Sequence, residues 1–195
     1  ILNHTESFPI TKQSEEQLKQ LKPIKLEHEF LRLVPLGEAH APRVISWRNA
    51  ETNRRFFLSN NTINLEEQIA WTQQLAGRID DFTYAIESNS DAVGMLGLYN
   101  IKYDPIQTGE IGRILVDSRH RRHGIASVAI NILLEFAFHE IMLQYVYANI
   151  LEQNVASRSL FEKIGFQEKF QFQTPERRSV IQLEINRDLF DLWKH

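Results

Sequence analysis

The chain has 195 residues, of which 43% are apolar and 24% charged, a composition typical of one globular domain with a sizeable core. Its net charge of -3 argues against a general nucleic-acid-binding protein, because such proteins carry an excess of basic side chains. It contains no cysteine, which excludes disulfides, thiolate metal sites and cysteine-borne covalent intermediates.

No run of apolar residues is long enough to cross a bilayer, and the sequence does not open with a signal-peptide pattern. The absence of cysteine fits a reducing compartment. We therefore expect a cytoplasmic protein that binds neither membrane nor nucleic acid. Residues 1–25 are polar and mixed, so we expect an N-terminal extension there, followed by one domain over residues 26–195.

The periodicity of apolar residues divides the domain into short elements. A period of two predicts a strand and a period near 3.6 predicts a helix, with glycine, proline and asparagine at the breaks. In chain order we expect a strand at 30–34, helices at 38–50 and 65–75, strands at 82–87, 93–102 and 110–116, a helix at 124–140, a strand at 144–150, a helix at 155–164, and strands at 166–172 and 179–185. Three consecutive strands interrupt the alternation, so this order predicts a mixed α/β sheet rather than a doubly wound one.

The most informative segment lies between the strand at 110–116 and the helix that follows it. It reads Arg121-Arg122-His123-Gly124-Ile125-Ala126. A helix start presents free backbone N–H groups and the positive end of the helix dipole, which together bind anions. Gly124 and Ala126 let a phosphate approach the backbone, and the arginines add charge. The segment predicts a pyrophosphate cradle; the alternative is a solvated basic loop that only caps the helix.

Two motifs resemble those of the GCN5-related N-acetyltransferases (GNATs). The acetyl-coenzyme A signature of that superfamily is Arg or Gln, two residues, Gly, one residue, then Gly or Ala, and residues 121–126 match it. A second family element is Asn followed seven residues later by an aromatic residue and eleven later by Gly-Phe, which Asn154, Phe161 and Gly165-Phe166 match. The resemblance covers roughly residues 30–185. It implies a GNAT fold, whose mostly antiparallel sheet is splayed between its fourth and fifth strands and flanked by helices.

The resemblance also implies direct transfer of an acetyl group from acetyl-coenzyme A (acetyl-CoA) to a primary amine, without a metal. The cradle would hold the pyrophosphate of the donor, the preceding strand would bind its pantetheine arm and thioester carbonyl through the backbone, and the second element would line the arm. The alternatives are a buried strand and a plain helix cap. The implied donor site consists of Ile114, Leu115, Val116, Arg121, Arg122, His123, Gly124, Ile125, Ala126, Ser127, Asn154 and Phe161.

Glu110, at the start of the central strand, is the expected general base, because most alkyl amine is protonated at neutral pH. The alternative is a surface glutamate near a turn. Arg113 in the same strand would either reach the substrate or pair with a carboxylate such as Glu110. Phe161 stands where the superfamily often has a tyrosine, so the role of general acid cannot be carried over to it. The proton for the leaving thiolate would then come from Ser157, Ser159, Tyr99, Tyr103 or water.

The front half of the domain carries the residues expected to bind the acceptor. It contains Trp47-Arg48-Asn49, Arg54, the segment Ile63-Asn64-Leu65-Glu66-Glu67, and Trp71. This pattern looks like that of bacterial acetyltransferases acting on nucleotide-linked amino sugars, such as those of pseudaminic acid synthesis. Aromatic rings would stack on a sugar or base and arginines would meet a diphosphate; the alternatives are core packing and a solvated helix end. The expected acceptor residues are Trp47, Arg48, Asn49, Arg54, Trp71 and Arg113.

The resemblance leaves other acceptors open. Related enzymes act on the N-termini of ribosomal proteins or on polyamines, and the missing tyrosine also permits a non-catalytic acyl-CoA-binding module. We expect a small-molecule amine, foremost a nucleotide-linked amino sugar, and the chain could form a homodimer. His120 and His123 are three residues apart, but neither a cysteine nor a third ligand accompanies them, so we expect no metal site.

Overall fold

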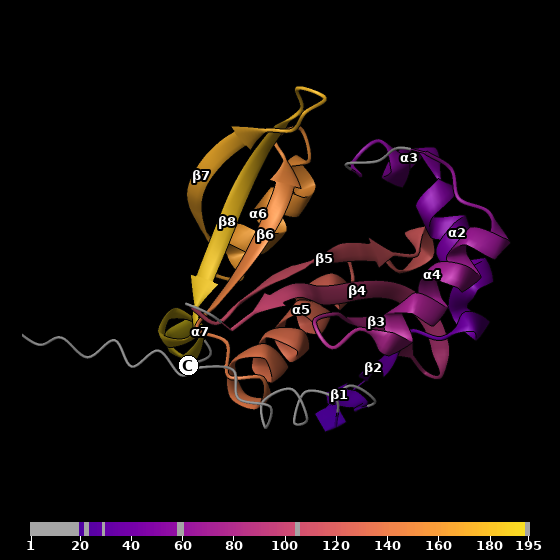
Figure 1. The fold of residues 1–195 in the computed structure, drawn as a ribbon, viewed down its shortest axis with the longest axis horizontal. Helices are drawn as coiled ribbons and strands as arrows, with labels where there is room; N and C mark the ends of the chain where they lie inside the picture. Colours follow the sequence, from indigo (N-terminus) through magenta and orange to yellow (C-terminus); the bar gives the residue numbers. More distant parts are fainter. Residues whose placement is uncertain (1–19, 22–23, 29, 58–60, 104–105, 194–195) are drawn as a thin grey trace, which may run out of the picture.

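The computed structural model describes residues 20–21, 24–28, 30–57, 61–103 and 106–193 (Figure 1). The strands of this part are β1 (Leu26–His28), β2 (Leu31–Pro35), β3 (Phe82–Ser88), β4 (Asp91–Lys102), β5 (Thr108–Val116), β6 (Tyr145–Leu151), β7 (Gln167–Gln173) and β8 (Ser179–Asn186). They form one sheet in the order β1-β2-β3-β4-β5-β6-β8-β7, antiparallel except between β5 and β6. The mixed α/β fold is confirmed, whereas the extension expected over residues 1–25 lies mostly outside the described residues.

The helices mostly follow the expected order. They are α2 (Ala41–Asn49), α3 (Glu51–Arg54), α4 (Leu65–Gly77), α5 (Ile125–Glu135), α6 (Val155–Lys163) and α7 (Arg187–Trp193). The helix expected at 38–50 opens with a 3-10 turn, and the one expected at 124–140 ends in a π turn after Glu135. Sequence periodicity missed β1, α3 and α7, because three to seven residues are too few to establish a period.

The sheet opens between β5 and β6, the expected fourth and fifth strands. Their parallel ladder joins Thr108, Gly109 and Glu110 to Tyr145, Val146 and Tyr147, and stops there. Both strands continue beyond the last pair, to Val116 and Leu151. In Figure 1 the β6-β8-β7 arm accordingly turns away from the β3-β4-β5 arm. The expected splay is confirmed.

A β-bulge lies on β5 just past the point of separation. Met95 pairs with Leu115 and Gly97 with Gly112, so two residues of β5 face the single residue Leu96 of β4. A bulge of this kind bends its strand and strengthens the local twist. It therefore steers β5 away from β6 at the place where the ladder ends.

The two faces of the sheet carry separate apolar clusters, because successive strand side chains point to opposite faces. Leu96 and Leu98 of β4 belong to one cluster, together with Ile130 and Leu133 of α5. Met95 packs in the other cluster, which includes Trp47 of α2. The first cluster fixes α5 under the sheet, and the second fixes α2 and α4 at the far end of the β3-β4-β5 arm.

Candidate active site

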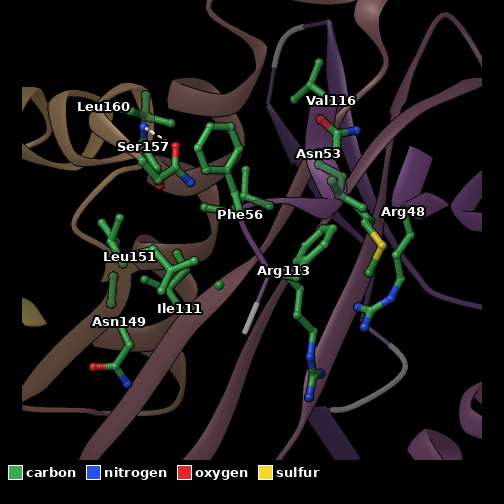
Figure 2. Close-up of a pocket in the computed structure, with 18 of the residues that line it drawn as sticks. Arg48, Asn53, Phe56, Ile111, Arg113, Val116, Asn149, Leu151, Ser157 and Leu160 are labelled. Atoms are coloured by element: carbon green, nitrogen blue, oxygen red, sulfur yellow. Dashed lines mark hydrogen bonds between the residues drawn. The ribbon is translucent and has the colours of Figure 1, made fainter. Parts of the chain in front are cut away.

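A cavity of about 840 Å³ lies where β5 and β6 diverge (Figure 2). One end is lined by residues of α2 and α4, and we call it the front end. The other is lined by residues of α6 and the loop before α5, and we call it the cradle end. In Figure 2, Arg48 and Arg113 extend on the side opposite to Ser157 and Leu160. Each arm of the splayed sheet therefore supplies one wall.

Glu110 lies where the two arms separate. It is the last residue of β5 that pairs with β6, opposite Tyr147. Its carboxylate accepts hydrogen bonds from the Tyr99 hydroxyl (3.1 Å) and the Asn100 side-chain amide (3.0 Å). Burial and the charge of Glu110 raise the pKa of Tyr99 above its usual range, so this hydroxyl keeps its proton at neutral pH. Glu110 thus presents an oriented proton acceptor to the cavity between its two ends.

Arg113 pairs with a carboxylate, but that carboxylate is Asp81 rather than Glu110. Its Nη1 lies 2.8 Å and 2.9 Å from the two Asp81 oxygens and 2.6 Å from Thr83 Oγ1. Asp81 is fully buried, whereas the Arg113 side chain is 23% exposed, so water reaches only the arginine of the pair. Arg113 still contributes to the cavity lining between the two ends.

An open helix start lies next to the cradle end, outside the residues that line the cavity. Gly124 is the N-cap residue of α5 with φ +75°, and it offers no side chain to cap the first turn. A Cβ at Gly124 would meet nothing within 4 Å, so an anion can approach the N–H groups of that turn. Arg121 and Arg122 line the cavity beside it. These groups fit a pyrophosphate, because they combine backbone donors, a helix dipole and two cations.

The rest of the expected cradle surrounds this helix start. His123 is exposed on the loop, whereas Ile125 is 5% exposed and anchors the first turn of α5 in the core. Ala126 and Ser127 are half-buried on the same turn. Neither these four residues nor Gly124 lines the cavity, so the expected cradle lies beside it.

Two strand edges connect the cradle to Glu110. Ile114, Leu115 and Val116 of β5 line one side, and residues 148–151 of β6 line the other. Because the ladder between these strands ends at Glu110, their facing backbone groups are available to a bound molecule. An extended chain could therefore run from the cradle to Glu110 while bonding only to backbone.

Residues of α6 close the cradle end. Asn154 accepts a hydrogen bond from the Ser157 backbone N–H (3.3 Å), so it caps α6 while also lining the cavity. Phe161 lines the cavity too, although it is 2% exposed and packs edge-on against Phe166 at 4.8 Å. Of the proton donors considered in place of a tyrosine there, Tyr99 and Ser157 line the cavity, and Ser159 and Tyr103 do not.

Arg48 and Trp71 line the front end as expected. The Arg48 guanidinium lies 4.8 Å from the centre of the Phe57 ring, and burial together with the charge of Arg113 lowers the pKa of Arg48. In the described part of the chain, no hydrogen bond or ion pair joins Arg48 to a carboxylate. A half-buried cation without an acidic partner is suited to bind an anion.

Three expected acceptor residues do not line the cavity, and we correct those expectations. Trp47 is 6% exposed in the core, and its indole N–H donates to Asp117 (3.1 Å). The Asn49 side chain bonds both backbone groups of Ile63 (2.8 and 3.0 Å), which fixes the approach to α4. Arg54 lies on α3, outside the lining. Trp47 and Asn49 flank Arg48 on α2, and adjacent helical residues point in different directions, so only Arg48 of the three lines the cavity.

The sequence analysis missed several residues of the site. Phe56 and Phe57 line the front end, and Asp81 and Asp117 anchor the arginines of the bulge and the loop before α5. None belongs to a recognisable motif. The only signal was Asp117 between an apolar strand and a basic segment, where a buried carboxylate would find a partner.

The described residues hold no group of three His, Cys, Asp or Glu side chains that could bind a metal ion. His120 contributes to no such group, although its Nδ1 is buried there without a hydrogen-bond partner. No helix in the same residues is long and apolar enough to span a bilayer.

Comparison with known proteins gives concordant matches. The family described as "Acetyltransferase (GNAT) domain" matches residues 31–167. The probable N-acetyltransferase YjcK of Bacillus subtilis (strain 168) is 28% identical over 125 residues, which are 58% of this chain and 68% of YjcK.

Solved structures of two kinds of acetyltransferase share the fold. Spermidine N-acetyltransferase from Vibrio cholerae, in complex with CoA and spermine, has a TM-score of 0.75 at 18% identity, over 84% of this chain and 99% of that one. FdhC, a nucleotide-linked sugar GNAT, has a TM-score of 0.74 at 16% identity, over 88% of this chain and 94% of that one. At such low identities the similarity shows a shared fold and does not identify the acceptor.

Proposed function

This chain belongs to the GNAT acetyltransferase family, and on that premise we propose that it acetylates the primary amine of a nucleotide-linked amino sugar. It is an N-acetyltransferase with acetyl-CoA as its co-substrate. The finer assignment of its acceptor rests on the front end of the cavity.

The donor extends from the cradle to Glu110. Its pyrophosphate lies at the start of α5, where backbone N–H groups and Arg121 and Arg122 neutralise it. Its pantetheine arm follows the edges of β5 and β6, beside Asn154 and Phe161. This path places the acetyl thioester beside the β5 bulge and close to Glu110.

Glu110 serves as the general base, directly or through one water. The ammonium form of the amine loses a proton to it, and the neutral nitrogen attacks the thioester carbon. The new C–N bond forms, the C–S bond breaks, and the nitrogen loses its second proton to a water on the way to the departing thiolate. The two hydrogen bonds from Tyr99 and Asn100 support this role, because they hold the carboxylate in one orientation.

The leaving thiolate takes up one proton. Phe161 has none to give, whereas Ser157 and Tyr99 line the cavity. Burial and Glu110 raise the pKa of Tyr99, which makes its phenol a reluctant acid. The second proton of the attacking nitrogen is therefore the source, and water carries it to the thiolate, with Ser157 able to relay it because a hydroxyl both donates and accepts.

The environment of Arg48 supports an anionic acceptor. It is a half-buried cation that lines the front end and has no acidic partner in the described residues. A phosphate group of a nucleotide-linked sugar would supply its missing charge partner. Phe56, Phe57 and Trp71 line the same end and offer faces to a sugar ring or a base.

The same arginine disfavours a polyamine, because a second ammonium group near Arg48 would be repelled. Glu67 also lines the front end, but its carboxylate already accepts a hydrogen bond from the Asn64 backbone N–H (2.8 Å). A protein N-terminus remains the second acceptor to test, because an open front end could admit a peptide.

The test is steady-state release of free CoA from acetyl-CoA, with nucleotide-linked 4-amino sugars, N-terminal peptides and polyamines offered as acceptors. We expect turnover with the nucleotide-linked sugars and a large loss of turnover in Glu110→Gln. Turnover confined to peptides or polyamines would keep the enzyme class and reject the proposed acceptor.

A further inference from the structure

The backbone of Arg113 has an uncommon conformation next to the reacting groups. Arg113 is one of the two bulge residues of β5, and its φ is +56°. Residues other than glycine rarely adopt this left-handed backbone conformation, because their Cβ crowds the backbone. Gly112 and Ile114 on either side line the cavity. The conformation of Arg113 therefore sets the direction in which the β5 edge faces the thioester.

A buried clamp holds the Arg113 side chain. Asp81 accepts from Arg113 with both oxygens, and the Thr83 hydroxyl donates to Asp81 Oδ1 (2.8 Å). Asp81 directly precedes β3, so the clamp spans β4 to reach β5. Gly97 of β4 makes this possible, since a Cβ there would lie 2.8 Å from Thr83 Oγ1 and 3.5 Å from Arg113 Cδ.

Two aromatic rings complete the clamp. The Arg113 guanidinium carbon lies 3.9 Å from the centre of the Tyr99 ring and 5.2 Å from that of Trp71. Tyr99 in turn donates its hydroxyl proton to Glu110. The bulge, the aromatic rings and the general base are thus linked through one guanidinium.

We propose that Asp81 is a positioning residue for acetyl transfer: by fixing Arg113, it keeps the β5 bulge in the shape that presents its backbone to the acetyl thioester. Asp81 lies outside the cavity lining and acts through Arg113. Without its carboxylate, a half-buried guanidinium loses its charge partner and the bulge loses its anchor. The inference rests on the proposed donor path and is independent of which amine is the acceptor.

The 13C chemical shift of the bound thioester carbonyl measures how well the β5 backbone is positioned. Acetyl-CoA labelled with 13C at the carbonyl is bound to the full chain without acceptor, and its chemical shift is compared with that of the free donor. Backbone donors aimed at the carbonyl oxygen polarise it and move this resonance. We expect Asp81→Asn to lose at least half of the shift on binding, while the Kd of acetyl-CoA, set by the cradle, changes less than threefold.

A rescue variant separates positioning from general damage. Glycine adopts a positive φ without strain, and it has no charged side chain that would lose its partner. The double variant Asp81→Asn/Arg113→Gly should therefore regain at least half of the lost shift. The matched control is Glu87→Gln, which breaks the 2.8 Å Arg32–Glu87 pair on the same sheet away from the cavity and should leave the shift unchanged.

Three results would overturn the inference: a full shift in Asp81→Asn, an equal loss in Glu87→Gln, or no shift in the wild type despite tight binding. Failure of the wild type to bind acetyl-CoA would instead refute the donor path. If Asp81→Asn does not fold, Arg113→Ala and Arg113→Gly replace it. The inference then requires the glycine variant to retain more of the shift than the alanine variant, and equal shifts reject it.

Discussion

The cradle end and the front end of the cavity offer different parts of the chain to a bound molecule. At the cradle end these are mainly backbone groups, namely the first turn of α5 and the free edges of β5 and β6, with the side chains of Arg121 and Arg122 beside them. At the front end they are side chains, such as Arg48 and Trp71. A backbone site depends on local conformation, which a short motif can encode. A side-chain site depends on which way each residue points after packing.

Glu110 lies between the two ends, so its loss should affect catalysis and spare both binding sites. Glu110→Gln should lower kcat about 100-fold or more, which is the usual contribution of a general base. The Kd of acetyl-CoA should stay within twofold, because the cradle is unchanged. Stopped assays of CoA release and calorimetry of donor binding measure the two quantities. A kcat within fivefold of wild type would remove Glu110 from the mechanism.

Asp117 joins α2 to the loop before α5, since its carboxylate accepts hydrogen bonds from the Trp47 indole N–H and from Arg119. Hydrogen bonds from Arg119 hold the pKa of Asp117 well below its usual range. A depressed folded pKa adds stability above the unfolded value of about 3.9, and this stability is lost as pH falls through the folded pKa.

Asp117→Asn should therefore unfold about 2 kcal/mol more easily at pH 7, and the difference should shrink as pH falls below about 4. Urea unfolding at a series of pH values measures it. Asp91→Asn is the matched control, because Asp91 is exposed and lies 3.9 Å from its Arg43 partner. A difference that is independent of pH would mean that the Asp117 carboxylate charge contributes nothing.

Arg48 tests the front end alone. Arg48→Ala should raise the KM of the anionic acceptor about 10-fold or more, because a charge-assisted hydrogen bond is lost. The Kd of acetyl-CoA should not change. Arg43→Ala on the same helix is the control, since its side chain is exposed and pairs only distantly with Asp91. If both variants raised acceptor KM equally, the two arginines would act through their general positive charge and Arg48 would make no specific contact.

Gly124 tests the cradle end alone. Alanine at φ +75° costs about 1 kcal/mol, so Gly124→Ala should weaken acetyl-CoA binding roughly fivefold with no effect on acceptor KM. Gly77→Ala is the matched control, because a Cβ there also meets nothing within 4 Å while its φ is not positive. A donor Kd unchanged in Gly124→Ala would show that the left-handed cap is dispensable for the cradle.

The same division explains what the sequence could and could not predict. Gly124 and Asn154 could be singled out because each belongs to a spacing that resembles a GNAT motif, and the structure places each at the N-cap of a helix. Trp47 and Trp71 look equivalent in sequence, and only the packing of α2 and α4 on the sheet turns one into the core and the other toward the cavity. Asp81 could not be predicted as the partner of Arg113, because the pair forms across β4 between residues 32 positions apart.

The two tryptophans give the smallest functional effect and the sharpest contrast. Trp71→Phe removes part of a ring that lines the front end, so it should raise acceptor KM about threefold with little loss of stability. Trp47→Phe removes the buried hydrogen bond to Asp117, so it should lower the free energy of unfolding by about 1 kcal/mol while acceptor KM stays within twofold. Thermal unfolding and acceptor titrations on both variants measure the two quantities. If Trp47→Phe raised acceptor KM as much as Trp71→Phe, the acceptor site would have to include the face of α2 that packs in the core. Residues that bind the acceptor and residues that only support the fold could then not be distinguished on this helix.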